Sequence, residues 1–414
     1  MKRKVFSLIL IPFLLLYAFP AGAVEKEERE WQDETIYFLM VDRFENGDRS
    51  NDKQVNMENP TAYQGGDFAG ISARLDELKD MGFTTIALTP IFQNSPNGYH
   101  GYWITDYYKV EEQLGTMKQF KDLVKEAHER GIRVMIDFPV THVGTEHPWM
   151  KDSDKNEWFV NKQDSNTEEW LGEMPALNLA NEETKNYLIQ AAKWWIKKTG
   201  IDGYYLSNAT KAPLSFWEDF SKEIKTQKKD VFLLGEADNV QQMTAYEQAG
   251  LDGLTNPLMM EPLRKQFVNT DRPSSESINV LKEIEKNVQE PRQLVNYFDH
   301  YKTERFTEDL KEENVFPGTR WKVGLTYLYT IPGIPLVYYG SEIAMTGKKG
   351  VDSHRFMSFR ADKELIDYIT QIGALRQQLP ALTRGSFEVL YEKDGMAVFK
   401  RQYKDETLIV AVNN

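Results

Sequence analysis

The chain contains no cysteine in its 414 residues. This absence excludes disulfides, thiolate metal sites and cysteine nucleophiles. Positive charge is also scarce, since 50 Lys and Arg residues stand against 63 Asp and Glu residues and give a formal net charge of −13. An acidic surface repels phosphate backbones, so we expect no nucleic-acid partner. The residues that are present, 41% hydrophobic and 27% charged, have the proportions of an ordinary globular protein.

Long hydrophobic runs are missing everywhere except near the N-terminus. There Lys2, Arg3 and Lys4 precede an apolar run over Val5–Ala18, and the small residues Ala21-Gly22-Ala23 follow it. This order is typical of a secretory signal peptide, which we expect to occupy residues 1–23. The alternative is an uncleaved N-terminal anchor, although the run is short for a bilayer span. We therefore expect a secreted protein that has no contact with a membrane after cleavage.

The rest of the chain alternates short β-branched, apolar runs with longer helical patterns. Expected strands lie at residues 35–41, 84–89, 133–138, 201–207, 231–236, 251–255, 293–298 and 335–340. Helical patterns between them include residues 71–81, 117–130, 182–198 and 274–289. Eight strands with interposed helices predict the α/β class and a (β/α)8 TIM barrel.

Two stretches depart from this alternation. The connection after the third expected strand, at about residues 142–180, is long and rich in Asp, Asn, Glu and Trp, and it predicts a small inserted domain. Residues 385–414 hold three strand patterns, which predict a short C-terminal antiparallel β segment. About 30 residues are too few for a sandwich, so this segment packs on the barrel or begins a domain that the sequence does not complete. We expect the barrel, with its insertion, to span residues 24–384.

Chemistry in such barrels lies where the strands end on their C-terminal side. A single polar side chain there more often caps or supports the fold, but several that converge at one rim indicate a site. The polar residues at or near the expected strands are Asp42, Asp137, His142, Asp202, Ser207, Glu236, Asp238, Asp299, His300, Tyr301 and Lys302.

Five longer motifs accompany these residues. They are Val41-Asp42-Arg43-Phe44, Tyr99-His100-Gly101-Tyr102-Trp103, Gly200-Ile201-Asp202-Gly203, Phe232-Leu233-Leu234-Gly235-Glu236 and Ile331-Pro332-Gly333-Ile334-Pro335. In this order and at this spacing the chain resembles the α-amylase family, glycoside hydrolase family 13, from Glu34 to about Arg384. The resemblance implies a barrel with a small domain inserted after strand 3. It also implies retaining chemistry on the α-1,4-glucosidic bonds of starch or maltodextrins.

The resemblance also implies where the catalytic groups stand. A carboxylate nucleophile would end the fourth strand, an acid/base glutamate would end the fifth, and a second aspartate would follow the seventh. Glu236 matches the acid/base, but Ser207 stands at the nucleophile position and Lys302 at the position of the second aspartate. Tyr205 replaces the arginine that orients the nucleophile, and Tyr301 replaces a histidine. One of the three catalytic carboxylates therefore remains.

Other positions keep the residues that contact sugar in the family. Asp137 and His142 match the third-strand motif, Tyr102 matches the aromatic that stacks under the −1 sugar, and His100 lies beside it. The candidate catalytic positions are thus Glu236, Ser207, Lys302 and Asp137. The candidate substrate-binding residues are Tyr102, His100, His142, Tyr205 and Tyr301.

An N-terminal loop resembles a calcium loop of some family members. Its alternating carboxylate, amide and carbonyl oxygens suit a hard cation, so we expect calcium there, and the alternative is a polar turn without metal. The candidate ligands are Asn46, Asp48, Asn51, Asp52, Gly65 and Asp67. A second calcium site of the family, between barrel and inserted domain, would use an asparagine, an aspartate and a histidine carbonyl. Those positions hold Thr141, Ala176 and Lys211, so we expect no calcium there.

The substitutions make the implied active site more positive. Asp to Ser adds +1, Asp to Lys adds +2 and Arg to Tyr subtracts 1, a change of +2 relative to the family. One cation about 5 Å from a cationic transition state opposes it by roughly 3 kcal/mol at an effective dielectric near 20. We therefore expect retaining hydrolysis to be strongly impaired or lost, with Lys302 paired to Glu236 in an inert pocket.

Other interpretations stay open at this point. Water in the gap left by Ser207 would permit a slow inverting reaction if Asp202 or Asp299 served as a distant base. The protein would then be a weak or unusual α-glucan hydrolase that uses Glu236. A non-catalytic member that binds an α-glucan or maltooligosaccharide, or a scaffold that binds a protein partner, fits the same sequence.

Overall fold

A computed structural model describes residues 28–161, 169–237, 240–268, 275–313, 317–359, 363–393 and 395–413. The chain divides into two units, Met1–Glu30 and Trp31–Asn414, and the helices and strands given below all lie in the second. The expected signal peptide, residues 1–23, falls outside the described residues. Within the described ranges, no helix combines the length and the apolar character that a membrane crossing requires.

Eight parallel strands close into a barrel in the order β1-β12-β11-β10-β9-β8-β5-β2. Their bounds are β1 (Ile36–Leu39), β2 (Thr85–Leu88), β5 (Arg133–Asp137), β8 (Gly203–Leu206), β9 (Phe232–Gly235), β10 (Gly253–Thr255), β11 (Leu294–Asn296) and β12 (Ile334–Tyr338). The ring closes through β1, where Ile36 lies opposite Thr85 on one side and Leu336 on the other. The predicted TIM barrel is therefore confirmed. These strands are buried on both faces, which explains why their sequences are nearly continuous apolar runs.

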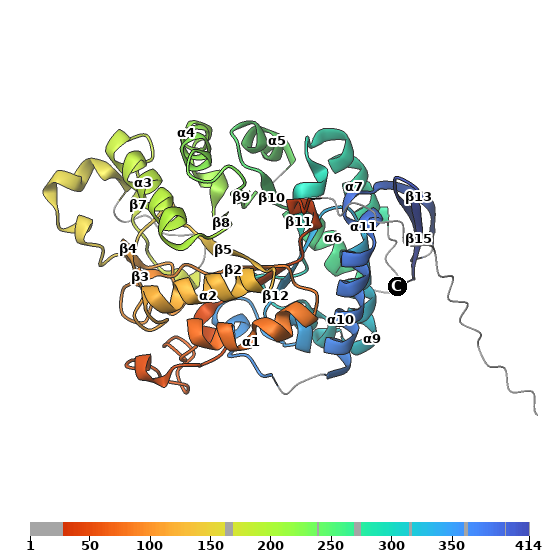
Figure 1. The fold of residues 1–414 in the computed structure, drawn as a ribbon, viewed down its shortest axis with the longest axis horizontal. Coiled ribbons are helices and arrows are strands. Elements are labelled where there is room, and N and C mark those ends of the chain that lie inside the picture. Colours follow the sequence, from red (N-terminus) through yellow and green to blue (C-terminus); the bar gives the residue numbers. More distant parts are fainter. Residues whose placement is uncertain are drawn as a thin grey trace, which may run out of the picture. The chain divides into compact units, whose positions relative to one another are not determined.

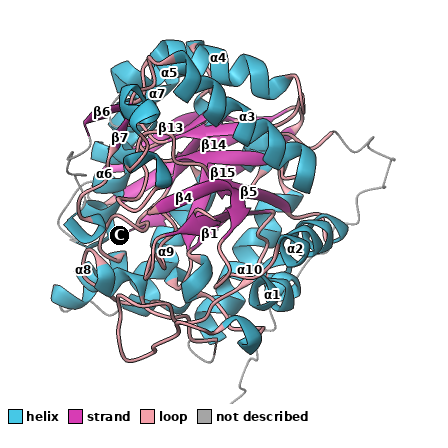
Figure 2. Cartoon of the chain, turned by 90° about the vertical axis from the view of Figure 1, so that its left-hand side faces the viewer, coloured by secondary structure: helices cyan, strands magenta, loops and turns pink. Residues whose placement is uncertain are grey.

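Helices surround the barrel strands, as Figures 1 and 2 show. They are α1 (Phe68–Asp80), α2 (Met117–Glu129), α3 (Glu182–Thr199), α4 (Leu214–Lys225), α5 (Val240–Gln248), α6 (Pro257–Val268), α7 (Ser275–Asn287), α8 (Phe306–Glu312), α9 (Pro317–Thr330), α10 (Lys363–Gln378) and α11 (Pro380–Arg384). Local signals set several of their ends. Thr116 and Gln119 form a capping box at the start of α2, and Gly200, at φ 79°, ends α3 in the left-handed conformation that glycine adopts without strain.

Between β5 and α3, the described residues 138–161 and 169–181 form only short elements. They are the 3-10 turns η4 (Pro148–Met150), η5 (Ser153–Trp158) and η6 (Glu169–Leu171), and a two-stranded sheet of β6 (Phe159–Asn161) and β7 (Ala176–Leu177). A second two-stranded sheet, β3 (Phe92–Asn94) with β4 (Ile104–Val110), precedes α2. The structure keeps these elements and the barrel in one unit, Trp31–Asn414. The limits expected for the inserted domain therefore stay a prediction.

The C-terminal segment forms the three-stranded antiparallel sheet that its pattern predicts. Its strands are β13 (Ser386–Lys393), β14 (Met396–Tyr403) and β15 (Glu406–Asn413). The sheet is attached to the barrel's helices, since the buried Arg401 donates to the carbonyl of Thr330 in α9 at 2.6 Å. Glu406 accepts the backbone N–H of Ala381 in α11 at 2.6 Å. In Figure 1 this sheet, in dark blue, lies beside α11.

Candidate functional site

The C-terminal ends of four barrel strands bring the expected catalytic positions to one place. Asp137 is the last residue of β5, Ser207 and Glu236 directly follow β8 and β9, and Lys302 lies in the loop after β11. Hydrogen bonds connect them, because the backbone N–H of Ser207 donates to Asp137 while Asn208 and Lys302 both donate to Glu236. The four positions expected from the sequence therefore meet in the structure.

Glu236 and Lys302 form an ion pair that is largely shielded from water. Their side chains are 11% and 12% exposed. Lys302 Nζ also donates to Asn208 Oδ1 at 3.1 Å, and the backbone N–H of Asn208 donates to Glu236 Oε2 at 2.8 Å. Burial would raise the pKa of Glu236, but the charge of Lys302, followed by His300 and the Asn208 N–H, outweighs it and lowers that pKa. The expected pairing of Lys302 with Glu236 is therefore confirmed, and Glu236 is ionised at neutral pH.

The backbone after β8 is shaped for this contact. Asn208 has φ 53°, in the left-handed region that asparagine tolerates better than most residues. The turn directs its N–H to Glu236 and its side-chain oxygen to Lys302. Asn208 thus links the two charged groups, which is a role that the sequence did not reveal.

Asp137 is the other carboxyl group at this centre, and it is completely buried. The hydroxyl of Tyr102 donates to its Oδ2 at 2.7 Å, and the N–H of Ser207 donates to its Oδ1 at 3.3 Å. Burial raises the pKa of Asp137 to about 7, although the hydrogen bonds from Tyr102 and Ser207 oppose that rise. Near neutral pH this carboxyl is therefore only partly ionised, and both of its oxygens are engaged.

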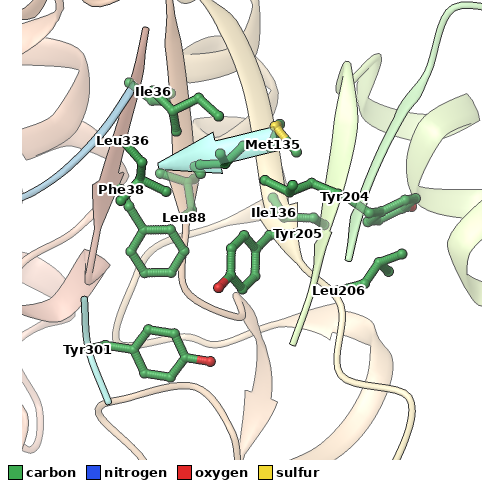
Figure 3. Close-up of a cluster of buried hydrophobic side chains, with 14 of the residues drawn as sticks. Ile36, Phe38, Leu88, Met135, Ile136, Tyr204, Tyr205, Leu206, Tyr301 and Leu336 are labelled. Atoms are coloured by element: carbon green, nitrogen blue, oxygen red, sulfur yellow. The ribbon is translucent and has the colours of Figure 1, made fainter. Parts of the chain in front are cut away.

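Aromatic rings fill the space beside these groups. The ring of Tyr301 lies nearly parallel to that of Phe38, with centroids 5.5 Å apart, and to that of Tyr102, with centroids 5.3 Å apart. Tyr205 packs edge-on against Phe38 at 5.1 Å, and Figure 3 shows the rings of Phe38, Tyr205 and Tyr301 facing the same space. Tyr301 is fully buried and Tyr102 is 2% exposed. The Tyr301 ring is therefore packed against rings from two other segments of the chain.

The loop that carries Tyr301 is held from a distant part of the chain. His354 Nε2 donates to the backbone carbonyl of Tyr301 at 2.7 Å, and the hydroxyl of Tyr99 lies 3.0 Å from His354 Nδ1. Burial lowers the pKa of His354 to about 3, so the imidazole is neutral and can make both bonds. Trp170 of η6 meets the ring of Tyr301 edge-on at 6.4 Å. No sequence signal identified His354 or Phe38 as part of this centre.

Three buried polar atoms at the centre have no hydrogen-bond partner among the described residues. They are His100 Nε2, Ser207 Oγ and Tyr301 Oη. His100 is oriented by its other nitrogen, since Nδ1 accepts the backbone N–H of Tyr102 at 3.0 Å. The carboxyl group next to Ser207 is Asp137, which accepts the Ser207 N–H and the Tyr102 hydroxyl, while Ser207 Oγ itself has no hydrogen-bond partner in the described part of the chain.

Several expected rim residues have structural roles instead. Asp202 precedes β8 and so lies at the opposite end of the barrel, where it binds His128, Lys228 and the N–H of Val134. The expected role of Asp202 as a distant base is therefore wrong, because Asp202 lies at the N-terminal end of β8 and the candidate catalytic positions lie at the C-terminal end.

Two more of the expected acids are committed elsewhere. Asp299 accepts the N–H of Phe306 at 2.7 Å and the hydroxyl of Ser341 at 3.0 Å, so both of its oxygens support the loop after β11. Asp42 accepts the N–H groups of Gln64 and Gly65, and its ion pair with Arg43 is fully buried. Asp238 lies outside the described residues.

His142 lies where the barrel meets the inserted segment. It forms an isolated β-bridge with Ala176, and its Nδ1 is 2.9 Å from Thr141 Oγ1. The backbone carbonyl of Thr141 accepts the N–H of Leu177. Thr141 and Ala176 are thus adjacent, as the family's second calcium site requires, but the threonine hydroxyl bonds to His142 and alanine has no side-chain oxygen.

The N-terminal loop gathers the residues expected to bind calcium. Asn46 Nδ2 donates to both carboxylate oxygens of Asp52, at 2.9 and 3.1 Å. Asp67 caps α1 through the N–H of Gly70 and also accepts the N–H of Asp48 at 2.7 Å. A side chain at Gly65 would lie 2.5 Å from Asn46 and 3.1 Å from Asp52, so the three residues are in close contact.

Oxygen atoms in this loop remain available to a cation. Asn46 Oδ1 and Asn51 Oδ1 are both buried and have no hydrogen-bond partner among the described residues. No three His, Asp or Glu side chains in those residues gather closely enough to hold a metal by themselves. A cation here would therefore depend on amide and carbonyl oxygens as well as carboxylates, which is the donor set that calcium accepts.

Comparison with known families identifies related sequences along most of the chain. Residues 38–173 and 164–376 match the family described as "Alpha amylase, catalytic domain". Residues 385–414 match the "Alpha-amylase C-terminal domain". A cyclomaltodextrinase of Geobacillus thermopakistaniensis is 31% identical over 418 residues, which span 93% of this chain and 69% of that protein.

Solved structures agree with the sequence matches. An α-amylase of Anoxybacillus, presented as a new glycosyl hydrolase subclass, superposes with a TM-score of 0.90 at 48% identity and covers 94% of this chain and 88% of its own. An α-amylase from Geobacillus thermoleovorans in complex with acarbose gives a TM-score of 0.88 at 46% identity and covers 93% and 88%.

The ion pair at the barrel centre leads to a first prediction, for the substitution Lys302→Met. This change leaves a buried carboxylate unpaired, so we expect it to lower the free energy of unfolding at neutral pH by about 3–5 kcal/mol. In the parent protein, the lowered pKa of Glu236 stabilises the fold above the unfolded value of about 4.3, and this contribution disappears as pH falls through the folded pKa. In the variant burial raises that pKa, so its stability should increase as pH falls from about 8 to about 5.

Urea denaturation at several pH values measures both effects. The matched control is Lys348→Met, because the Lys348 side chain is 69% exposed and pairs with Glu312 at 3.4 Å on the surface. We expect that control to change stability by less than about 1 kcal/mol. Equal and pH-independent losses in the two variants would contradict the prediction.

Proposed function

The chain belongs to the α-amylase family, and from this premise we propose that it engages α-glucans such as maltooligosaccharides while retaining hydrolysis is strongly impaired or lost. Its relatives include proteins named as α-amylases and cyclomaltodextrinases, and one of the similar structures holds acarbose. The single observation that carries the proposal is the buried ion pair between Lys302 and Glu236.

Retaining hydrolysis needs a proton donor and a carboxylate nucleophile about 5 Å apart. Glu236 is the candidate donor, but its pKa is lowered and it already accepts two hydrogen bonds, so it carries no proton to give at neutral pH. Ser207 ends the strand from which the nucleophile would come. A serine attacks only when a neighbouring base takes its proton, and Ser207 Oγ makes no hydrogen bond to a base among the described residues.

Asp137 does not replace the missing nucleophile well. Its pKa of about 7 leaves it partly protonated, and Tyr102 and Ser207 occupy its two oxygens. An inverting reaction would instead need a base that activates water opposite the acid. Asp202 lies at the other end of the barrel, and Asp299 is bonded to Phe306 and Ser341. These contacts favour loss of hydrolysis over the slow inverting reaction.

The stacking of Tyr301 on Tyr102 supports the same proposal, because it affects where a sugar can bind. A sugar ring stacks on an aromatic face by burying apolar area. Tyr102, the residue that the family resemblance assigns to the −1 sugar, already stacks on Tyr301, whose ring centroid lies 5.3 Å away at an interplanar angle of 17°. A glucose unit at this position would have to displace Tyr301. We therefore propose that a bound glucan contacts the rim of the barrel and does not enter its centre.

We also propose that the N-terminal loop binds one calcium ion. Asn46, Asn51 and Asp52, with the backbone near Gly65, supply the hard oxygen donors that calcium prefers. The two buried amide oxygens without partners support this assignment. A bound ion would tie the residues before α1 to those that follow β1, and its role would be structural. The site next to Thr141, Ala176 and Lys211 lacks such donors, and we propose that it holds no calcium.

The N-terminal segment supports a proposal about location. Its three basic residues, apolar run and small residues at Ala21-Gly22-Ala23 are those of a secretory signal. We propose that residues 1–23 are removed and that the mature protein acts outside the cell. The lack of cysteine is compatible with this location but leaves the fold without disulfide support.

Sugar release from maltoheptaose tests the loss of hydrolysis. We expect the parent protein to release reducing sugar about 10⁴-fold or more slowly than an active relative assayed in parallel, because a missing nucleophile typically costs at least that much. Calorimetry with maltoheptaose measures binding separately. Release by the parent that disappears in Glu236→Gln would contradict the proposal and support a weak hydrolase. If the protein neither releases sugar nor binds maltoheptaose, a protein partner would be favoured instead.

A gain-of-function variant makes this test sharper. Ser207→Asp, Lys302→Asp, Tyr301→His and Tyr205→Arg together restore the family's charges and remove the ring stacked on Tyr102. We expect this combined variant to release sugar at least about 100-fold faster than the parent. Adding Glu236→Gln to the combined variant should abolish this activity, because Glu236 supplies the proton in the combined variant.

Calcium binding should appear as added stability. At a calcium concentration about 100 times the dissociation constant, a single site adds roughly 2.7 kcal/mol to the free energy of unfolding relative to EDTA. Asp52→Asn should reduce this increment, whereas Asp122→Asn, which alters an exposed helix pair with Lys118, should leave it unchanged. A calcium effect that persists in full after Asp52→Asn would place the ion elsewhere.

The mature N-terminus tests secretion. When the full chain is expressed in a secreting bacterial host, mass spectrometry of the culture medium should find a protein that begins at Val24. A full-length protein confined to the membrane fraction would instead indicate an uncleaved anchor.

A further inference from the structure

The loop that follows β11 has a clamped base. Arg264 of α6 joins its two ends, because Nη1 donates to the carbonyl oxygens of Phe298 and Glu304, at 3.1 and 3.0 Å. Another nitrogen of the same guanidinium pairs with Asp309 of α8 at 2.6 Å. A loop whose ends are held together in this way has the form of an Ω-loop. Its tip can therefore change position while its base stays fixed.

The tip of this loop begins at His300, ends at Thr303 and is bonded mainly within itself. The N–H of Lys302 donates to His300 Nδ1 at 3.1 Å, and the N–H of His300 donates to Thr303 Oγ1 at 3.0 Å. Among the described residues, one hydrogen bond from outside reaches the backbone of the tip, from His354 Nε2 to the carbonyl of Tyr301 at 2.7 Å. The tip is thus a self-contained turn that can move as one body.

His354, which makes this bond, is fixed independently of the tip. It is 2% exposed. Arg305 Nε donates to the carbonyl of the preceding residue, Ser353, at 3.0 Å. Three residues further on, the N–H of Met357 donates to the carbonyl of Arg43 at 2.8 Å. The imidazole is therefore a fixed point against which the tip is held.

The two hydrogen bonds of His354 determine its tautomer. A carbonyl oxygen can only accept, so the Nε2 that faces Tyr301 carries the hydrogen, and Nδ1 accepts the hydroxyl of Tyr99 at 3.0 Å. The guanidinium of Arg43 lies over the ring of Tyr99, with its central carbon 3.9 Å from the ring centroid. Without the His354 donor, the buried carbonyl of Tyr301 would have no partner, and the closed position would be destabilised.

We propose that the tip is an autoinhibitory plug of the barrel centre and that His354 is the positioning residue that holds it closed. In the closed position Tyr301 stacks on Tyr102 and Lys302 pairs with Glu236. Both contacts come from the tip, so they are lost together when it moves. The open position frees the ring that the family resemblance assigns to the −1 sugar. This inference rests on the proposed binding of α-glucans and extends it from the rim to the centre.

The open position is the less populated one, because it gives up ring packing and leaves a buried carboxylate unpaired. A ligand that binds only the open form has an apparent affinity reduced by the fraction of protein that is open. A buried carbonyl that loses its donor shifts such an equilibrium by roughly tenfold. Replacing His354 should therefore raise the open fraction, and with it the affinity for a glucan, about tenfold.

Acetylation of Lys302 by acetic anhydride measures the opening without any sugar, because the 12% exposed amine is freed only when it leaves Glu236. We expect mass spectrometry to find Lys302 labelled about tenfold faster in His354→Phe than in the parent. His354→Gln, whose amide replaces the Nε2 donor, should label at nearly the parent rate. Lys185, which is 15% exposed and paired with Asp219, should label equally slowly in all three proteins. Equal labelling of Lys302 in the parent and His354→Phe would overturn the proposal.

A second variant and a matched control guard against a general loss of stability. Tyr99→Phe removes only the hydroxyl that orients His354, and it should speed the labelling of Lys302 about threefold. In the control, His147→Phe, a histidine that is also 2% exposed is removed from the inserted segment, where its Nδ1 accepts the N–H of Trp149 at 3.2 Å. The control should label Lys302 at the parent rate. An acceleration equal to that in His354→Phe would overturn the proposal.

Calorimetry with maltoheptaose tests the autoinhibition itself. We expect His354→Phe to bind the sugar about tenfold more tightly than the parent, and Tyr102→Leu in the His354→Phe background to remove this gain. Faster labelling of Lys302 without tighter binding would overturn the autoinhibitory role. Absence of binding to both the parent and His354→Phe would contradict the proposed glucan function, whereas equal labelling would contradict the role of His354. The two failures are therefore distinguishable.

Discussion

The ammonium of Lys302 and the carboxylate of Glu236 meet where water barely reaches either group. Each of these buried charges depends on the other, because removing one would leave the other buried without a partner. Asn208 adds a donor to the carboxylate and an acceptor for the ammonium, so the pair is hydrogen-bonded on both sides. A centre arranged in this way favours a fixed, ionised Glu236. Proton transfer to a leaving group requires the opposite state.

The same loop supplies both the cation and the ring that covers Tyr102. Tyr301 and Lys302 are consecutive, and the loop is closed by bonds from Lys302 N to His300 Nδ1 and from His300 N to Thr303 Oγ1. His354 holds the Tyr301 carbonyl from another part of the chain. The electrostatic change and the steric change are therefore coupled. Moving Tyr301 away from Tyr102 would also disturb the contact between Lys302 and Glu236.

Strand β1 separates two different environments. On its inner side Phe38 belongs to the aromatic stack, and on its outer side Tyr37 binds Glu342. Both environments contain a carboxyl group with a perturbed pKa, but the causes differ. A cation holds Glu236 ionised, whereas burial without a cationic partner in direct contact leaves Glu342 close to half-protonated at neutral pH. The barrel wall therefore separates two buried carboxyl groups whose pKa values are shifted in opposite directions.

The barrel itself was accessible from the sequence. All eight expected strands coincide with observed ones within a few residues, because strands buried on both faces are short, dense apolar runs with polar residues at their ends. The placement of Ser207, Glu236 and Lys302 at one rim followed from the same pattern. Asp202 was wrongly grouped with the rim residues, because it belongs to the N-terminal end of the expected strand and directly precedes β8, which begins at Gly203.

The sequence by itself determined the family, the barrel, and the chemical types of the residues that meet at its centre. The tertiary structure alone decided that Tyr301 stacks on Tyr102, that His354 anchors the Tyr301 carbonyl, and that Glu342 accepts the Tyr37 hydroxyl on the outer side of β1. The physical reason is that composition and periodicity report on residues that are neighbours in the sequence. Ring stacking and carboxyl burial instead depend on segments 50 to 300 residues apart, whose side chains meet only after the barrel has closed.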